Sequence, residues 1–228
     1  MKQQILKFKF AEKSKEFFVN NNNYFAYNII RKWPDWGNQL VFIYGPEKCG
    51  KTFISEMWSK ESNGIYVSPN NFCEQIPDQL DIEFVKSKNW ILDDVDKIIE
   101  DKNSDNIYKI LNLINIIKDN KKSFLLMTAS RSPKFIECKL ADLTSRMLSS
   151  IVIEVSYPSQ DLLCKIIQKY LKDRNVELSE KCLKYISDRM ERSYDSAISI
   201  AEKIDAKSME SKAKITTYFL KDLLDLRY

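Results

Sequence analysis

The sequence of 228 residues has no histidine, only four glycines, and no apolar run near the roughly 18 residues that a membrane-spanning helix needs. Without histidine, Ser-His and Cys-His catalysis are excluded and the commonest metal ligand is absent. Any chemistry must therefore use carboxylates, lysine, arginine and a bound ion. The N-terminal segment MKQQILKFKF interrupts its apolar residues with lysine, unlike the core of a signal peptide. We therefore expect a cytoplasmic protein with no membrane partner.

The cysteines and the charges do not point to a special environment. Lysines cluster at 118–122 (KDNKK), but the formal net charge is only +4 and acidic residues are interspersed along the chain. This pattern predicts a solvated surface rather than a dedicated DNA groove. The cysteines show no C-x-x-C spacing, so we expect reduced core residues rather than a disulfide or a zinc site. There are five of them: Cys49, Cys73, Cys138, Cys164 and Cys182.

Two of the four glycines lie in YGPEKCGKTF, residues 44–53, which fits the phosphate-loop pattern G-x-x-x-x-G-K-[ST]. The apolar run 40–44 precedes the loop and helix-like spacing follows at 51–58, which is the strand, loop, helix context that the motif requires. Backbone N–H groups would cradle phosphates, Lys51 would neutralise their charge and Thr52 would ligate Mg²⁺. The alternative is a tight turn without a ligand. The candidate nucleotide-binding residues of this loop are Gly45, Pro46, Cys49, Gly50, Lys51, Thr52 and Phe53.

The order of apolar patterns predicts an α/β fold followed by a helical domain. Strand-like runs alternate with helical patterns, notably at 106–120, which argues for a parallel sheet covered on both faces. After Pro158 only 3.6-residue periodicity remains, with Ser159, Ser179 and Thr216 at N-cap positions. We therefore expect an N-terminal segment at 1–20, an α/β nucleotide-binding domain at 21–157 and a helical domain at 158–228. The predicted strands lie at 40–44, 64–68, 89–94, 123–129 and 150–155.

Two carboxylates end the run WILDD and supply the acidic half of a nucleotide site. Asp93 would lie near the metal and Asp94 near an attacking water, as a general base. A helix N-cap is the alternative for this pair, because aspartate also favours that position. We expect Asp96 to lie on the surface.

Three further polar positions have two interpretations each. Thr128 or Ser130, at the end of the fourth strand, would either sense the γ-phosphate or satisfy their own turn. Arg146 would either reach a phosphate held by a neighbouring subunit or pair with a local carboxylate. Arg192 lies near the start of a helix, where the dipole disfavours positive charge, so it would face an anion such as the bound nucleotide.

Taken together, these motifs resemble the AAA+ module of the DnaA family of replication initiators, and most closely its short Hda-type relatives. The fold implied is an AAA+ P-loop NTPase with a five-stranded parallel sheet and a C-terminal helical lid. The resemblance is carried by IIRKWPDWGNQLVFIYGPEKCGKT (29–52) at the phosphate loop, by IYKILNLIN and SFLLMTASRSP up to sensor 1, by LADLTSRM with Arg146 at the arginine-finger position, and by 156–193 at the start of the lid with Arg192 at the sensor 2 position.

The resemblance implies a regulator of replication initiation that binds ADP or ATP with Mg²⁺. It would dock on the sliding clamp of DNA polymerase III, contact DNA only through that clamp, and present Arg146 to ATP held by DnaA. The initiator would be left in its inactive ADP form, and intrinsic ATP hydrolysis by the regulator would be slight. Such a protein would be associated with the nucleoid through the replisome, and a homodimer is also open. The chain ends at Tyr228 without the initiator's helix-turn-helix domain, and 69–85 contains no lysine or arginine.

Hda-type proteins begin with a short glutamine-led apolar motif that binds the clamp. Here QQILKFKF offers two registers, one led by Gln3 with Leu6 and Phe8, the other by Gln4 with Leu6 and Phe8 or Phe10. An edge strand that packs on the domain would show the same apolar and lysine alternation.

Three other functions remain open at this point. The first is an autonomous ATPase of the initiator or helicase-loader type with Asp94 as base. The second is a small-molecule P-loop kinase, and the third is an adaptor with an empty site.

Overall fold

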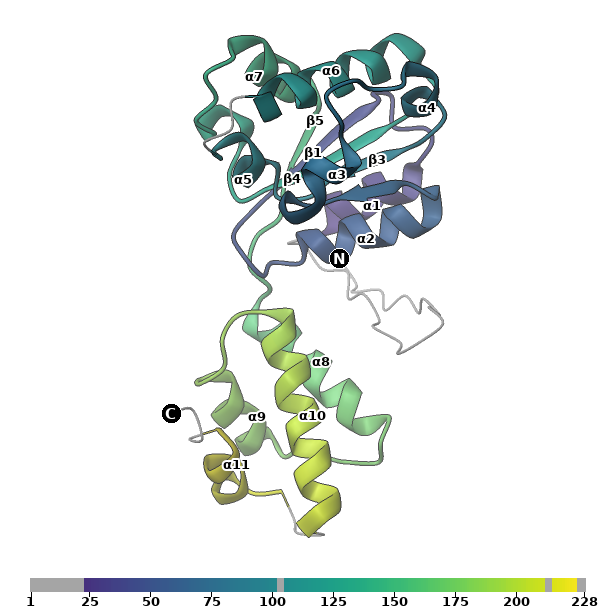
Figure 1. Cartoon of the computed structure of the whole chain (residues 1–228). Coiled ribbons are helices and arrows are strands. Elements are labelled where there is room, and N and C mark those ends of the chain that lie inside the picture. The colour runs from purple at the N-terminus through teal and green to yellow at the C-terminus, as the bar shows by residue number, and fades with distance from the viewer. Residues whose placement is uncertain (1–22, 102–104, 212–214, 225–228) are drawn as a thin grey trace. The chain divides into compact units, whose positions relative to one another are not determined.

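The computed structural model describes residues 23–101, 105–211 and 215–224, which divide into an α/β unit, Asn23–Ser156, and a helical unit that begins at Tyr157 (Figure 1). The candidate clamp-binding residues Gln3, Gln4, Leu6 and Phe8 lie outside the described residues. Within the described ranges, no helix combines the length and the apolar character that a membrane crossing requires.

The α/β unit contains the predicted five-stranded parallel sheet, with the strand order β2-β3-β4-β1-β5. All five runs that the apolar pattern indicates are strands, so the predicted fold class is confirmed. The strands are β1 (Leu40–Tyr44), β2 (Ile65–Val67), β3 (Trp90–Leu92), β4 (Leu125–Ala129) and β5 (Ile151–Glu154).

Helices cover both faces of this sheet, which is why its central strands β3, β4 and β1 are almost entirely buried (Figure 1). Helices α1 (Tyr24–Lys32) and α2 (Lys51–Ser62) pack on one face. The opposite face meets α6 (Asp105–Asn120), whose buried isoleucines and leucines recur at spacings of three and four residues. The remaining helical segments of the unit are η1 (Pro69–Asn71), α3 (Phe72–Gln75), α4 (Ile82–Lys86), α5 (Val95–Ile99), η2 (Pro133–Phe135) and α7 (Ala141–Leu148).

Because the strands are parallel, the sheet has two chemically different edges. The phosphate loop, the Asp93–Asp94 pair and Ser130 all follow strand ends, and they lie together at the carboxyl edge. The amino edge holds the segments that enter the strands. There the Asn38 side chain donates to the carbonyl oxygen of Ser149 at 2.9 Å and joins the entries to β1 and β5.

The described residues of the helical unit form four helices with a separate apolar core. The three predicted N-caps are confirmed, since the hydroxyls of Ser159, Ser179 and Thr216 accept from backbone N–H groups three residues later at 3.2–3.3 Å. The helices are α8 (Gln160–Lys172), α9 (Glu180–Ser187), α10 (Tyr194–Ser211) and α11 (Thr217–Leu224).

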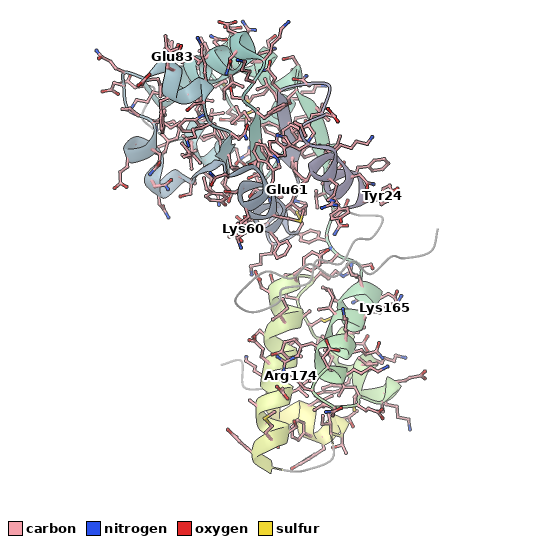
Figure 2. The ribbon with its side chains drawn as sticks, turned by 90° about the vertical axis from the view of Figure 1, so that its right-hand side faces the viewer. Tyr24, Lys60, Glu61, Glu83, Lys165 and Arg174 are labelled. Atoms are coloured by element: carbon pink, nitrogen blue, oxygen red, sulfur yellow. The ribbon has the colours of Figure 1, made fainter. Side chains whose placement is uncertain are left out.

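An ion pair connects the end of α8 to α10 on the surface of this unit. Arg174, labelled in Figure 2, lies with its Nε 3.0 Å from the carboxylate of Asp205 and with its guanidinium carbon 3.7 Å from the ring centre of Tyr170. Stacking on the ring and pairing with the carboxylate together fix a side chain that would otherwise be mobile in solvent.

All five cysteines are free thiols, as expected. Cys49 and Cys182 are buried, but Cys73 is exposed, so the expectation of a core position is wrong for Cys73. Cys73 lies on the short helix α3, whose one buried residue is Phe72, so its neighbours on that helix face solvent.

Position 45 requires glycine because the chain just after β1 passes very close to the chain just after β5. A Cβ at this position would lie 1.9 Å from the carbonyl oxygen of Val155, the residue that follows β5. We expect Gly45→Ala to lower the free energy of unfolding by about 2–3 kcal/mol, because backbone rather than a flexible side chain must move. Urea-induced unfolding followed by circular dichroism measures this loss.

Gly37→Ala is the matched control for this substitution. Gly37 has a φ of +71° but nothing within 4 Å of an added Cβ, so only backbone strain of about 1 kcal/mol opposes the change. Equal losses in the two variants would contradict the role of the Val155 contact.

Candidate functional site

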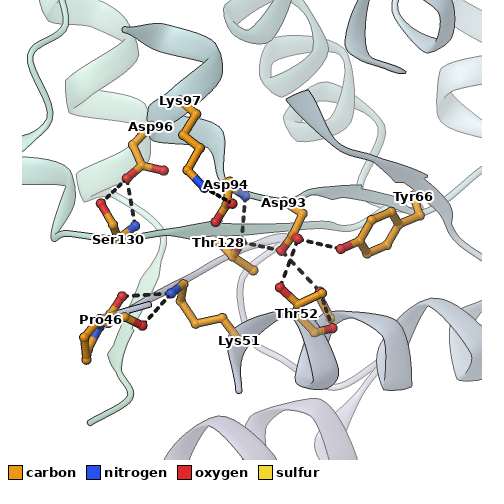
Figure 3. Close-up of polar contacts among 12 residues, drawn as sticks. Pro46, Lys51, Thr52, Tyr66, Asp93, Asp94, Asp96, Lys97, Thr128 and Ser130 are labelled. Atoms are coloured by element: carbon orange, nitrogen blue, oxygen red, sulfur yellow. Dashed lines mark hydrogen bonds and ion pairs between the residues drawn. The ribbon is translucent and has the colours of Figure 1, made fainter. Parts of the chain in front are cut away.

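The phosphate loop closes on itself through the side chain of Lys51. Gly50, with a φ of 101°, turns the chain into α2, which begins at Lys51. The Lys51 ammonium group is almost fully buried, and it donates to the carbonyl oxygens of Gly45 and Pro46, both at 2.8 Å (Figure 3). The first amides of a helix have no partners within the helix, so this loop presents N–H donors beside a lysine. Such a donor set suits phosphate oxygens.

The other residues of the loop that were predicted to bind nucleotide differ in how far they are buried. Cys49 is buried, and its burial raises the pKa of the thiol, which keeps it neutral and disfavours a nucleophilic role. Pro46 and Phe53 are partly buried, and the Thr52 side chain is exposed.

Asp93 is the acidic centre of the carboxyl edge. It follows β3, is 7% exposed, and accepts hydrogen bonds from hydroxyls on three other elements (Figure 3). Thr128 of β4 and Tyr66 of β2 each donate at 2.6 Å, and Thr52 of α2 donates at 3.2 Å. The hydroxyl of Ser55, one turn further along α2, lies 3.4 Å away.

Asp93 and Thr52, the two predicted metal ligands, thus lie side by side. A carboxylate and a hydroxyl are ligand types that Mg²⁺ accepts when nucleotide phosphates complete its coordination. No group of three or more Cys, Asp and Glu side chains within the described ranges could hold a metal alone. Thr52 and Asp93 therefore fit an ion whose remaining ligands are nucleotide phosphates and water.

Thr128 links the two acidic residues. Its hydroxyl donates to Asp93 and accepts from the backbone N–H of Asp94 at 2.9 Å, and the residue is fully buried. Because both functions of the hydroxyl are used, Thr128 fixes the distance between β3 and β4. Its role in sensing a phosphate stays a prediction.

Asp94 begins α5 with a left-handed backbone, φ 50° and ψ 48°, and makes no side-chain cap. Its carboxylate instead pairs with Lys97 at 2.7 Å, and this hydrogen bond raises the pKa of Lys97. One of the two carboxylate oxygens of Asp94 is thus engaged by an internal ammonium group. The role of Asp94 as a general base stays a prediction, and its ion pair with Lys97 argues against that role.

The expectation that Asp96 lies on the surface is wrong. Asp96 is 2% exposed, and one carboxylate oxygen accepts from both the N–H of Ser130, at 2.8 Å, and its hydroxyl. The short helix α5 packs against β4, so its second residue lies beneath the loop that follows that strand. Asp96 therefore holds the loop in which Ser130 was a candidate phosphate sensor.

Tyr66 and Ser55 are contacts of Asp93 that the sequence did not indicate. Tyr66 lies opposite Ile91 in the register of β2 and β3, on the same face as Asp93 two residues later. The alternation of side chains along each strand shows that Tyr66 and Asp93 share a face only once β2 and β3 are known to be neighbours. Ser55 lies one turn after Thr52, which is the available signal for a second hydroxyl on that helix face.

Arg146 lies far from the phosphate loop, toward the amino edge of the sheet. It is in the last turn of α7, and the following Ser149 is bonded to Asn38 at the entry to β1. Its Nε is 3.6 Å from the carboxylate of Asp142, one turn earlier, and both side chains are more than one-third exposed. The local pairing interpretation is thus met in this structure, while the role in trans stays a prediction.

Arg192 belongs to the helical unit and precedes the helix α10. The cap of that helix is Ser193, whose hydroxyl accepts from the N–H of Ser196 at 3.1 Å. Arg192 is exposed, and its role toward a nucleotide stays a prediction.

Comparison with known sequences places relatives over almost the whole chain. The family described as the lid domain of Hda matches residues 161–224. An uncharacterised protein of Haemophilus influenzae is 25% identical over 218 residues, 92% of this chain and 93% of that protein. The chromosomal replication initiator protein DnaA of Buchnera aphidicola is 25% identical over 217 residues, 89% of this chain, which spans about half (49%) of the initiator's length.

Comparison with solved structures gives the fold a name. Domain III of the Thermotoga maritima initiator DnaA has a TM-score of 0.75 at 20% identity, covering 92% of this chain and 93% of that one. DnaA bound to AMPPCP and single-stranded DNA has a TM-score of 0.72 at 22% identity, covering 85% and 64%. The branch migration motor RuvB of T. maritima scores 0.66 at 16% identity, covering 90% and 68%. The α/β unit and the helical unit thus form an AAA+ fold, as predicted.

The variant Ser130→Ala tests the hydrogen bond between the Ser130 hydroxyl and Asp96, which the sequence did not indicate. In Ser130→Ala one carboxylate oxygen of Asp96 keeps only a backbone donor, and we expect the free energy of unfolding to fall by about 1–3 kcal/mol. Chemical denaturation measures the loss. Ser132→Ala is the control, because this hydroxyl makes no cap bond and its removal should change stability by less than about 0.5 kcal/mol. Similar values for the two variants would refute the role of Asp96.

Proposed function

We propose, from the premise that this chain is a DnaA-related AAA+ protein of the Hda type, that it is a nucleotide-binding regulator of chromosomal replication initiation. It acts on DnaA by supplying Arg146 to the ATP that DnaA holds, and it does so while docked on the sliding clamp. The observation that carries this proposal is the position of Arg146 relative to the chain's own phosphate loop.

The nucleotide, ADP or ATP, is held at the carboxyl edge of the α/β unit. The loop amides and Lys51 bind its phosphates, and the Lys51 ammonium group already lies within the loop, where it donates to the carbonyl oxygens of Gly45 and Pro46. Thr52 and Asp93 hold the Mg²⁺ that accompanies the phosphates, and the ion supplies charge neutralisation there. Arg192 of the lid is the remaining candidate contact to the nucleotide.

Arg146 cannot serve this same nucleotide. Its helix α7 ends at the amino edge, where Ser149 contacts Asn38 at 2.9 Å and Lys118 at 3.2 Å. The five residues of β1 separate that edge from the phosphate loop, a distance of about 16 Å. An arginine side chain is much shorter than this strand. A phosphate that Arg146 contacts therefore belongs to another molecule.

The present partner of Arg146 is easily exchanged. The pair with Asp142 joins residues one turn apart on an exposed helix surface at 3.6 Å, and such pairs stabilise by only about 0.3–0.5 kcal/mol. A guanidinium group binds phosphate with two parallel hydrogen bonds, which are stronger than this single long contact. The helix thus keeps Arg146 oriented without holding it tightly.

The chain's own hydrolysis of ATP is slight in this proposal. Asp94, the candidate base, is paired with Lys97 at 2.7 Å, so the second acid is occupied by an internal cation. The bound nucleotide then has mainly a structural role, and the hydrolysis that matters occurs on DnaA. An autonomous ATPase of the initiator or helicase-loader type remains the second candidate, since the same loop and acids would serve it.

The clamp and DNA complete the set of partners. The segment that contains Gln3, Gln4, Leu6 and Phe8 docks in the clamp, and the clamp brings the regulator to DNA and to the replisome at the nucleoid. A homodimer of the AAA+ module is a further candidate assembly.

Arg146→Ala tests the proposal directly. We expect DnaA, clamp-loaded DNA and the Arg146→Ala protein to hydrolyse ATP on the order of a thousandfold more slowly than with the wild type, because arginine fingers contribute a factor of that size. Release of labelled phosphate is the measurement. Unfolding of the variant should match the wild type, since the Asp142 pair is exposed.

Two controls make this assay specific. Arg189→Ala removes an arginine whose guanidinium lies 3.9 Å from the Tyr185 ring in the helical unit, and it should leave the stimulation unchanged. The wild type alone, without DnaA or clamp, should hydrolyse little ATP. Undiminished stimulation by Arg146→Ala contradicts the finger role, and rapid turnover by the wild type alone favours the autonomous ATPase.

Removal of residues 1–10 tests the docking step. We expect the truncated protein, and the double variant Leu6→Ala, Phe8→Ala, to lose retention on immobilised clamp, because a few buried apolar anchors supply most of the energy of such contacts. The wild type should be retained. Exchange of Lys7→Ala and Lys9→Ala is the control within the same segment and should preserve binding. A wild type that does not bind the clamp would remove the docking step from the proposal.

A further inference from the structure

Tyr66 makes one of the two shortest contacts to the metal-binding aspartate. It lies on β2, the edge strand beside β3, and its hydroxyl donates to Oδ2 of Asp93 at 2.6 Å (Figure 3). The side chain is only partly exposed. In Figure 3 its ring lies on the side of Asp93 away from Thr128, so the two hydroxyls approach the carboxylate from opposite directions.

The hydrogen-bond acceptors of Asp93 are almost fully used. An ionised carboxylate has about two acceptor sites on each oxygen. Oδ2 accepts from Thr52 at 3.2 Å and from Tyr66 at 2.6 Å, whereas Oδ1 accepts from Thr128 at 2.6 Å. Ser55 lies 3.4 Å from Oδ1, but its single hydrogen has a closer acceptor in the Thr52 carbonyl oxygen, at 2.9 Å. Oδ2, the oxygen on the Thr52 side, therefore has no unused site.

These donors differ in whether they are compatible with a metal ion. Thr52 can continue to donate its hydrogen to Asp93 while a lone pair of its own oxygen faces the ion. Thr128 occupies the other oxygen and is anchored by the Asp94 N–H. Tyr66 takes the second site on Oδ2, the oxygen next to Thr52, where a Mg²⁺ ion ligated by Thr52, or a water bound to that ion, would approach the carboxylate.

We propose that Tyr66 is a positioning residue that competes with the divalent cation for Asp93 and thereby sets the Mg²⁺ concentration at which nucleotide is held. This inference rests on the proposed binding of a nucleotide with Mg²⁺. In the absence of the ion the Tyr66 hydroxyl keeps the buried carboxylate satisfied, and the ion must displace that hydroxyl to reach it.

Tyr66 is a permanent donor near neutral pH. Burial, and then the hydrogen bond to Asp93, raise its pKa well above that of an ordinary tyrosine. The hydroxyl therefore keeps its hydrogen and can donate it to Asp93.

The test is a Mg²⁺ titration of nucleotide binding, with fluorescently labelled ADP and anisotropy as the readout. We expect Tyr66→Phe, which keeps the ring, to lower the half-saturating Mg²⁺ concentration about three- to tenfold, the equivalent of one net hydrogen bond. Its affinity for ADP in the presence of EDTA should equal that of the wild type. Tyr66→Met, which also lacks the hydroxyl, should shift the titration in the same direction.

Tyr44→Phe is the matched control for these variants. It removes a hydroxyl that lies 3.3 Å from the carboxylate of Glu154 in the same unit, and it should titrate as the wild type does. Half-saturation of Tyr66→Phe at the wild-type concentration, or at a higher one, overturns the competition, and a higher one would mean that Tyr66 orients Asp93 for the metal.

The titration also separates failure of this inference from failure of the proposed function. If the wild type binds ADP equally with Mg²⁺ and with EDTA, the metal site is wrong and the inference falls with it, while nucleotide binding stands. If the wild type binds no ADP under either condition, the proposed nucleotide site is itself refuted.

Discussion

A carboxylate at the end of a buried strand is costly unless hydrogen-bond donors surround it, and at the carboxyl edge of this sheet that requirement falls on Asp93. Its donors come from α2, β2 and β4, so one charge fixes the distances among four elements. None of these donors is a cation. Hydroxyls satisfy the oxygens without neutralising them, and the negative charge stays available to a metal ion. The site can thus be rigid before any ligand arrives.

The parallel sheet imposes a second constraint by separating its two edges. The loop, the acids and Ser130 follow strand ends, while the last turn of α7 precedes the start of β5. Under the proposed function, the nucleotide contacts of the chain itself and the phosphate contact of Arg146 therefore concern different molecules. In the proposed regulator, the phosphates that the chain itself holds thus lie out of reach of its own Arg146.

The elements could be predicted from the sequence because their signals are local. The apolar run of β1, the glycines of the loop and the caps at Ser159 and Ser179 each depend on residues within one or two turns. Asp93 and Thr52 could be predicted because Thr52 belongs to the phosphate-loop motif, and such a loop is completed by a carboxylate at the end of another strand. Asp96 and Tyr66 depend instead on which strands are neighbours. The order β2-β3-β4 places Tyr66 beside Asp93, and the packing of α5 on β4 buries Asp96. Neither of these contacts can be predicted from the spacing of apolar residues within a single strand or helix.

The groups proposed to bind phosphate or metal share one property in this structure, which is a modest internal partner. Lys51 donates to two carbonyl oxygens, Arg146 pairs with an exposed carboxylate one turn away, and Asp93 accepts from a tyrosine. Each partner satisfies a polar group that would otherwise be unpaired, and each is weaker than the ligand that we propose would replace it. Binding then exchanges one satisfied arrangement for another and costs little reorganisation. Because the sequence has no histidine, no imidazole takes part in this exchange.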